Sequence, residues 1–306
     1  MHILAIDIGG TTIKSDVYDE KGHSFNYFKE EETPIDSLKK SNHIMEYVLN
    51  LVGETIKSLK QINKKLEGVA ISSAGVVDPE QGKIVYAGYT IPDYVGTDFK
   101  QAINHHFDLP CVVLNDVNAA AFAEFSIGAF ARNSSLVCLT IGTGVGGALI
   151  LNGQLYHGEG FSAGEVGYLP VNGKRFQDVA STTAMRQYFE QLTGESNTNG
   201  KIIFEAYKTN HPAAIETINW FAENFSEGLL PIIYLINPEY IVLGGGIMNQ
   251  HKILLPIILE KLAAKIENNI FLPKAILAAK YSNEAGRIGA LYYFIKKYGF
   301  VLQIKN

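Results

Sequence analysis

Glycine gathers at three points in this sequence, and each point directly follows a short apolar run. A pair stands at residues 9–10, ten of the 29 glycines lie between residues 142 and 173, and three are consecutive at 244–246. The apolar runs before them are rich in isoleucine, leucine and valine, as buried strands are. Glycine admits positive φ and lets a ligand approach the backbone, so these clusters favour phosphate-binding turns over flexible linkers. Tight β-hairpins without a ligand are the alternative for each cluster.

Strands and helices are predicted to alternate along the whole chain. Apolar spacing predicts helices near 41–60, 99–107, 117–130, 213–235, 251–266 and 284–297, and strands near 2–7, 13–18, 25–29, 69–73, 111–114, 136–141, 147–151 and 240–243. Each half of the chain begins with a strand and a glycine turn. The sequence therefore predicts two α/β domains with a cleft between them.

The charge of the chain argues against nucleic acid or an acidic membrane as a partner. Lys and Arg number 26 and Asp and Glu 31, which gives a net charge of −5, and no basic run exceeds a pair. The longest apolar run, residues 229–236, is far shorter than the roughly 20 residues of a membrane span. The N-terminus lacks a charged leader, so no secretory signal is expected. Cys111 and Cys138 fall in apolar strands, which predicts buried thiols and fits a cytoplasmic protein.

Five motifs occur in order along the chain. They are DIGGTTIK at 7–14, NDVNAAA at 115–121, GTGVGG at 142–147, GEVG at 164–167 and LGGG at 243–246. Together they resemble the ROK family of sugar kinases and regulators, in the actin-like ATPase superfamily. The resemblance covers nearly the whole chain, and five ordered motifs are far more specific than any one of them.

This resemblance implies a fold and an activity. The expected fold is a two-domain actin-like ATPase (ribonuclease H-like) α/β fold with an interdomain cleft, in which residues 1–117 and about 287–306 form the smaller domain and 118–286 the larger. The implied activity is that of an ATP-dependent sugar kinase with Mg²⁺, which phosphorylates a small-molecule sugar at a hydroxyl, expected to be O6 of a hexose, N-acetylhexosamine or β-glucoside. Relatives also suggest a homodimer.

Two other functions from the same superfamily are open at this point. One is a sugar-responsive transcription regulator, but such relatives carry a helix-turn-helix segment before the first motif, and only six residues precede Asp7 here. The other is a catalytically idle sugar-binding member.

The first and third motifs are expected to hold the phosphates of ATP. The Asp7 carboxylate can hold Mg²⁺, usually through water, while glycine backbone and threonine hydroxyls meet phosphate oxygens. The residues assigned to the nucleotide are Asp7, Gly9, Gly10, Thr11, Thr12, Lys14, Gly142, Thr143 and Gly144, and the resemblance adds Gly244, Gly245 and Gly246 as the turn beside adenosine. An ordinary hairpin turn is the alternative for the first motif.

The third motif also satisfies the pattern G-x-G-x-x-G of dinucleotide-binding domains. That fingerprint requires a helix directly after the last glycine. Here residues 148–151 continue as an apolar strand. We therefore interpret the motif as a glycine hairpin and not as part of a Rossmann domain.

Asp116 is the predicted catalytic base. Phosphoryl transfer to a hydroxyl needs a carboxylate that accepts the hydroxyl proton, and Asp116 stands where a strand ends and a helix begins. An N-cap role, which Asn115 or Asp116 could fill, is the structural alternative. The resemblance implies that Asn115, Glu165 and Gly75 contact the sugar.

The sequence departs from the family after Glu165. Most relatives continue with Gly-His and a cysteine-rich zinc loop that ends in a second sugar-contacting glutamate. Here Tyr168 replaces the histidine, residues 169–176 contain no cysteine, and Gln177 takes the place of the second glutamate. No structural zinc is therefore expected. Tyr168 and Gln177 are assigned to the sugar, with core packing as the alternative for Tyr168, and the identity of the sugar stays open.

Overall fold

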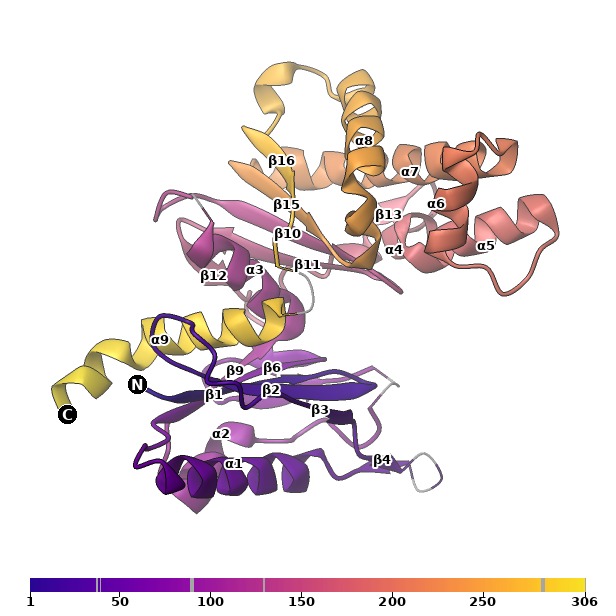
Figure 1. The fold of residues 1–306 in the computed structure, drawn as a ribbon. Coiled ribbons are helices and arrows are strands. Elements are labelled where there is room, and N and C mark those ends of the chain that lie inside the picture. The colour runs from indigo at the N-terminus through magenta and orange to yellow at the C-terminus, as the bar shows by residue number, and fades with distance from the viewer. Residues whose placement is uncertain (37, 39, 89–90, 129, 282–283, 306) are drawn as a thin grey trace. The chain divides into compact units, whose positions relative to one another are not determined.

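The computed structural model describes residues 1–36, 38, 40–88, 91–128, 130–281 and 284–305. The chain divides into two compact units (Figure 1). Unit 1 comprises Met1–Phe130, Gly158–Ser162 and Asn283–Asn306, and unit 2 comprises Ala131–His157 and Ala163–Ser282. Each unit is built on a five-stranded sheet.

The sheet of unit 1 has the strand order β3-β2-β1-β6-β9. β1, β2 and β3 form an antiparallel meander, and β6 and β9 continue the sheet in parallel with β1. The elements of this unit are β1 Ile3–Ile8, β2 Thr12–Tyr18, β3 Lys29–Glu32, β4 Ile35–Asp36, β5 Ser41–Asn42, α1 Ile44–Gln61, β6 Gly68–Ser73, β7 Val76–Asp78, β8 Lys83–Tyr86, α2 Phe99–Phe107, β9 Cys111–Asn115, α3 Asp116–Ile127 and α9 Ala285–Lys305.

Alternate residues of β1 face the two sides of this sheet. Leu4 and Ile6 belong to a core with α1 and α2, whereas Ile3 and Ala5 belong to a second core with α3 and α9. α3 and α9 pack so closely that a Cβ on Gly289 would collide with the Ala119 backbone. Because this packing joins α3 to unit 1, the unit extends to residue 130, later than the boundary at 117 that the sequence suggested.

The sheet of unit 2 repeats the same topology in the order β12-β11-β10-β15-β16. Its first three strands are antiparallel, and β15 and β16 continue in parallel with β10. The elements are β10 Leu136–Ile141, β11 Val145–Leu151, β12 Gln154–Tyr156, η1 Val166–Tyr168, β13 Pro170–Val171, β14 Lys174–Arg175, α4 Phe176–Ala180, α5 Thr182–Thr193, α6 Gly200–Lys208, α7 Pro212–Ile236, β15 Tyr240–Gly244, η2 Gly246–Gln250, α8 His251–Lys265, η3 Asn269–Phe271 and β16 Ala275–Ala278.

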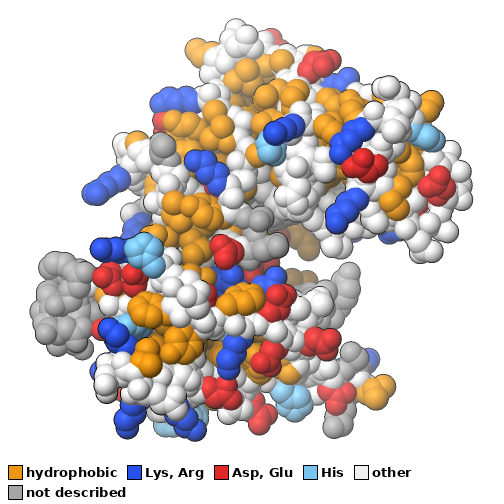
Figure 2. Space-filling view, viewed as in Figure 1, with side chains coloured by type: hydrophobic (Ala, Val, Ile, Leu, Met, Phe, Trp, Pro, Cys, Tyr) orange, Lys and Arg blue, Asp and Glu red, His pale blue; other side chains and the backbone are white. Residues whose placement is uncertain are grey.

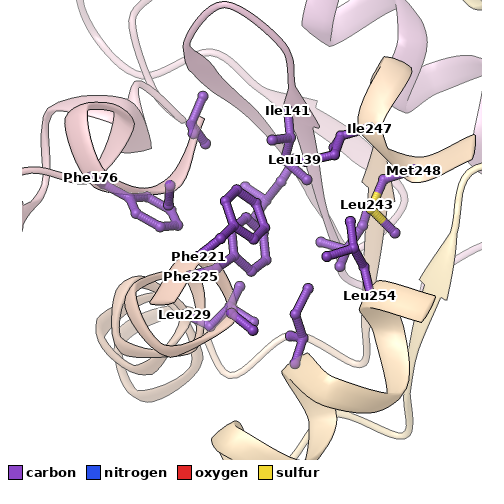
Figure 3. Close-up of a cluster of buried hydrophobic side chains, with 14 of the residues drawn as sticks. Leu139, Ile141, Phe176, Phe221, Phe225, Leu229, Leu243, Ile247, Met248 and Leu254 are labelled. Carbon is purple, nitrogen blue, oxygen red and sulfur yellow. The ribbon is translucent and has the colours of Figure 1, made fainter. Parts of the chain in front are cut away.

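The core of unit 2 anchors the turn that follows β15. Figure 3 shows Phe221 and Phe225 of α7 stacked beside the strands, with the ring of Phe176 next to them. Ile247 and Met248 are buried in the same core, so η2 is fixed directly behind the glycine turn. The turn therefore has a rigid support on its buried side.

One predicted strand is misplaced. The sequence favoured a strand over residues 25–29, but β3 begins at Lys29. The buried Asp16 carboxylate accepts hydrogen bonds from Tyr27 N at 2.9 Å and from Ser24 Oγ at 2.6 Å. Together with the positive φ of 60° at Asn26, these bonds hold the segment as a loop.

Cys111 and Cys138 are both buried, as predicted. No helix among the described residues is long and apolar enough to cross a membrane. Acidic and basic side chains are interspersed on the face of the two units in Figure 2.

Candidate active site

Asp7 lies at the carboxyl end of β1 and is held by the neighbouring strand. Its Oδ1 accepts a 2.8 Å hydrogen bond from Ser72 Oγ, and the parallel register places the two residues side by side. A Cβ at Gly286 would lie 2.6 Å from Asp7 Oδ1, so α9 can begin here only because residue 286 is glycine. Loss of hydration raises the pKa of Asp7, and the Ser72 hydrogen bond and the charges of Arg287 and Lys14 oppose that rise.

The turn after β1 is closed by hydrogen bonds of its own. Gly9 N donates to Thr12 O at 3.0 Å, and Thr33 Oγ1 donates to Gly9 O at 2.7 Å. Lys14 faces Asp7 across the hairpin, with its Nζ 3.4 Å from Glu30 Oε1. This end of the β1–β2 hairpin brings together the predicted phosphate residues of unit 1, which are Asp7, Gly9, Gly10, Thr11, Thr12 and Lys14.

The start of α3 assigns different tasks to Asn115 and Asp116. Asn115 is the N-cap residue, and its Oδ1 accepts hydrogen bonds from Val117 N and Asn118 N. Its Nδ2 donates to Gly75 O at 2.9 Å and to Asp116 Oδ1 at 2.8 Å. The capping role that the sequence left open thus falls to Asn115, and the Asp116 carboxylate is not needed to cap α3.

The pKa of Asp116 is raised to about 6. The side chain is open to solvent, but the protein around it limits the hydration of the carboxylate, which is the largest cause of the rise. The negative charge of Asp7 adds to it, while hydrogen bonds from Val117 N and Asn115 oppose it. A carboxylate with a pKa close to neutral pH is suited to accept a proton.

Gly75 lies in a loop that is fixed from both sides. Its φ is +95°, and a Cβ would lie 2.7 Å from Tyr86 O, so no other residue fits without strain. The Ser73 hydroxyl lies 2.7 Å from the hydroxyl of the buried Tyr94, and Asn115 donates to the Gly75 carbonyl. Sequence reasoning missed Tyr94.

The glycine turn of unit 2 joins β10 to β11. Gly142 N donates to Gly144 O at 3.0 Å, and Thr182 N, at the start of α5, donates to Gly142 O at 2.9 Å. β11 begins at Val145 and runs on as a strand, so no helix follows the glycines. The prediction of a glycine hairpin in place of a dinucleotide fingerprint is confirmed.

Two adjoining cavities of unit 2 lie beside this turn. A cavity of 340 Å³ is lined by Gly142, Thr143, Thr182, Thr183, Arg186, Asn199, Gly200, Gly246 and Ile247. A cavity of 360 Å³ is lined by Thr182, Asn199, Gly200, Lys201, Phe204, Gly246, Ile247, Asn249 and Gln250. Five lining residues are common to both, so the two form one continuous recess. Three of the predicted nucleotide residues, Gly142, Thr143 and Gly246, line it.

The glycines around this recess are needed for different reasons. Gly245 has a φ of +92°, and a Cβ there would collide with the Ile141 backbone, so the fold itself requires glycine. At Gly142 and Gly246 the φ is not left-handed, and a Cβ would meet no protein atom within 4 Å. Neither strain nor packing explains these two glycines, and both line the 340 Å³ cavity. A ligand that lies against the backbone would explain them.

The predicted sugar residues of unit 2 lie close to the glycine turn. Glu165 precedes η1, its side chain is exposed, and loss of hydration raises its pKa. Tyr168 is 56% exposed, which rules out the alternative that it packs in the core. A Cβ on Gly144 would lie 2.8 Å from Gln177 Oε1, and one on Gly167 would lie 3.1 Å from it. Gln177 therefore packs against the glycine turn at residues 142–144 as well as against the segment that contains Glu165.

Comparison with known proteins decides the family. The model of the ROK family matches residues 3–297. This chain belongs to the ROK family. An uncharacterized protein of Clostridium perfringens strain 13 is 40% identical, with 94% of this chain and 96% of that protein covered. A β-glucoside kinase of Listeria innocua serovar 6a is 30% identical, with 97% and 98% covered.

A solved structure confirms the predicted fold class. The structure of a ROK family glucokinase from Streptomyces griseus, in complex with glucose and AMPPNP, has a TM-score of 0.76 and 26% identity. The match covers 96% of this chain and 99% of that one. The α/β fold of actin-like ATPases expected from the motifs is therefore the fold of this protein.

Residues 170–175, where most relatives have a zinc loop, form a β-hairpin in this protein. β13 and β14 pair around Asn172 and Gly173, whose φ values of 50° and 75° are both left-handed, as a two-residue Asn-Gly turn requires. Phe176 N donates to Leu169 O at 2.7 Å and closes the base of the hairpin. Within the described part of the chain, no three His, Cys, Asp or Glu side chains are grouped to hold a metal. Backbone pairing alone accounts for the shape of this segment.

Proposed function

We propose that this ROK protein is an ATP-dependent sugar kinase that transfers the γ-phosphoryl group of ATP to a sugar hydroxyl, O6 of a hexose, N-acetylhexosamine or β-glucoside. The observation that carries the proposal is the carboxylate of Asp116, which lies at the start of α3 and has a pKa of about 6. Asn115 caps the helix, so the Asp116 carboxylate is free for another role. The similarity to a β-glucoside kinase and to a glucokinase solved with glucose and AMPPNP supports the same reaction.

In the proposed reaction Asp116 is the general base. Its Oδ1 is held by Val117 N and Asn115 Nδ2, which leaves Oδ2 to accept the proton of the attacking hydroxyl. The proton moves to Asp116 as the hydroxyl oxygen bonds to the γ-phosphorus and ADP leaves. The sugar contacts are Gly75, Asn115 and Asp116 of unit 1 and Glu165, Tyr168 and Gln177 of unit 2.

The nucleotide binds in the recess of unit 2. The 360 Å³ cavity takes adenosine, a volume in the range of small-molecule pockets, and the 340 Å³ cavity takes phosphates against Gly142, Thr143 and Gly144. Gly244, Gly245 and Gly246 form the turn beside adenosine. The two glycines that neither packing nor φ explains, Gly142 and Gly246, support this assignment.

Unit 1 supplies the group that fits a magnesium ion. Mg²⁺ prefers oxygen ligands and is commonly held by one or two carboxylates together with substrate phosphates, and the Asp7 carboxylate has one oxygen fixed by Ser72. Mg²⁺ supplies neutralisation of the phosphate charge during transfer. The backbone at Gly9 and Gly10, the hydroxyls of Thr11 and Thr12, and the Lys14 ammonium contact the phosphates.

The test is a coupled assay of ADP release with Mg·ATP. Glucose, mannose, N-acetylmannosamine, N-acetylglucosamine, allose, fructose and cellobiose are offered one at a time, together with an aryl β-glucoside. We expect ADP release that depends on one class of sugar, and a new phosphate ester on O6 by ³¹P and ¹³C NMR of the product.

Each failure of this screen has a distinct meaning. Mg·ADP binding without sugar-dependent ADP release for any sugar would favour the idle sugar-binding member. Specific binding of operator-like DNA in a gel shift, weakened by a sugar, would favour the regulator.

A further inference from the structure

Arg287 lies outside all five motifs and is unusual in its burial, its hydrogen bonding and its position in α9. Its side chain is only 3% exposed. Its Nε and Nη1 atoms have no hydrogen-bond partner among the described residues. It is also the third residue of α9, where the positive end of the helix dipole disfavours a cation.

The guanidinium is nevertheless held in one place. Nη2 lies 3.5 Å from Glu284 Oε1, and Cζ lies 4.9 Å from the centre of the Phe28 ring, in a cation–π contact. The guanidinium also donates a hydrogen bond to the Tyr18 hydroxyl. The preceding residue, Gly286, is the one whose missing side chain lets α9 meet Asp7 Oδ1. The positive charge of Arg287 helps to lower the pKa of Asp7, as a smaller cause than the hydrogen bond from Ser72.

Two buried N–H groups of Arg287 stay without a partner, so the contacts with Glu284, Phe28 and Tyr18 do not fully explain why the residue is arginine. A buried donor without a partner carries the full loss of its hydration, and an apolar side chain of similar volume commonly replaces a buried charge without harm. Methionine has nearly the length of arginine and would lie against Phe28 without unpaired N–H groups. Residues that break local rules in this way are expected at functional sites.

We propose that Arg287 is a positioning residue of the phosphoryl-transfer site, whose buried positive charge fixes the Asp7 carboxylate where it meets the metal and phosphates. This inference rests on the proposed function, because only a kinase has a phosphoryl-transfer site at Asp7. Arg287 does not touch the substrate. It acts through Asp7. The absence of a side chain at Gly286 allows the start of α9 to lie against the Asp7 carboxylate.

The test uses the full chain with three substitutions. Arg287→Met removes the charge and keeps most of the volume, Arg287→Lys keeps the charge, and Lys297→Met removes a charge further along α9, where Lys297 pairs with Glu80 at 3.1 Å. Each variant is assayed for its melting temperature, for Mg·ADP affinity by calorimetry, and for kcat and KM with the best sugar of the screen.

We expect Arg287→Met to melt at or above the temperature of the original protein, yet to lose about 10- to 100-fold in Mg·ADP affinity and in kcat/KM for Mg·ATP, as is typical when support of a metal-binding group is lost. Arg287→Lys should recover part of both losses, and Lys297→Met should match the original protein.

Two results would overturn the proposal. One is an Arg287→Met protein that binds Mg·ADP and turns over normally. The other is an Arg287→Met protein that melts well below the original, because Arg287 would then be a structural anchor. Mg·ADP binding does not require phosphoryl transfer, so it tests Arg287 even if the original protein phosphorylates none of the sugars, which would be the failure of the proposed kinase function alone.

Discussion

The two sheets share one strand order but carry different chemistry at the same position. Each has an antiparallel meander of three strands followed by two parallel strands. The first hairpin of each sheet closes on an isoleucine, Ile8 in unit 1 and Ile141 in unit 2. The residue before it is Asp7 in unit 1 and Thr140 in unit 2, so a carboxylate in one sheet corresponds to a hydroxyl in the other.

The residues beside these two positions in the adjacent strands also differ: they are polar or charged in unit 1 and glycine in unit 2. Lys14 and Ser72 flank Asp7 in the adjacent strands, whereas glycine occupies both positions beside Thr140. Unit 1 therefore gathers charged and polar side chains at the end of its sheet, whereas the positions beside Thr140 in unit 2 carry no side chain. Topology sets where a site can form, and the side chains decide what it does there.

The largest effect is expected from removing Asp116, the proposed base of unit 1. Asp116→Asn keeps the shape of the side chain and leaves Asn115 as the cap of α3, so the fold should persist. The substitution removes the proton acceptor, and we expect kcat/KM to fall by about 10²- to 10⁴-fold. Sugar-dependent ADP release measures this loss. Mg·ADP affinity and the melting temperature are the controls and should change little, and near-normal turnover by the Asp116→Asn variant would refute the assignment.

The sequence predicted the parts of the site that depend on short segments. A strand, a glycine turn and a polar residue at the strand end are local patterns, and they correctly placed Asp7, Asn115, Asp116 and the turn at Gly142 at the ends of strands. The same reasoning gave the wrong place for the third strand, because the buried Asp16 carboxylate holds residues 24–27 as a loop.

The parts that depend on tertiary packing were not predictable from local pattern. Asn199 and Gly200 line the recess of unit 2, but the rest of α5 separates them along the chain from Thr182, which also lines it. Arg287 looks like an ordinary helix residue until α9 packs on β1 and β2 and buries it. Two features of the sequence could have pointed to the recess. They are the hydroxyls at 182–183 and the Asn-Gly pair at 199–200, because residues of these types commonly stand where a helix begins.

An intermediate effect should separate glycines that serve the fold from glycines that serve a ligand. Gly142→Ala adds a methyl group in open space at the recess, so the melting temperature should hold while Mg·ADP affinity falls about tenfold, a change of about 1.4 kcal/mol. Gly245→Ala is the matched control, because the same methyl group collides with the Ile141 backbone at a positive φ. That variant should lose about 1–3 kcal/mol of unfolding free energy. Calorimetry and thermal melts distinguish the two variants, and a Gly142→Ala protein with normal Mg·ADP affinity would count against the proposal that this turn binds phosphate.

The smallest effect is the pH dependence, which compares the carboxylates of the two units directly. Asp116 must be deprotonated to accept a proton, so kcat/KM should fall about tenfold for each pH unit below its pKa and level off above it. With the pKa of Asp116 raised to about 6, the inflection should lie near pH 6, well above the value of about 3.9 for an unperturbed aspartate. Glu165 of unit 2 also has a raised pKa, but it is assigned to sugar binding. Glu165→Gln should therefore raise KM for the sugar and leave the inflection in place, and an inflection that disappears in this variant would move the base from unit 1 to unit 2.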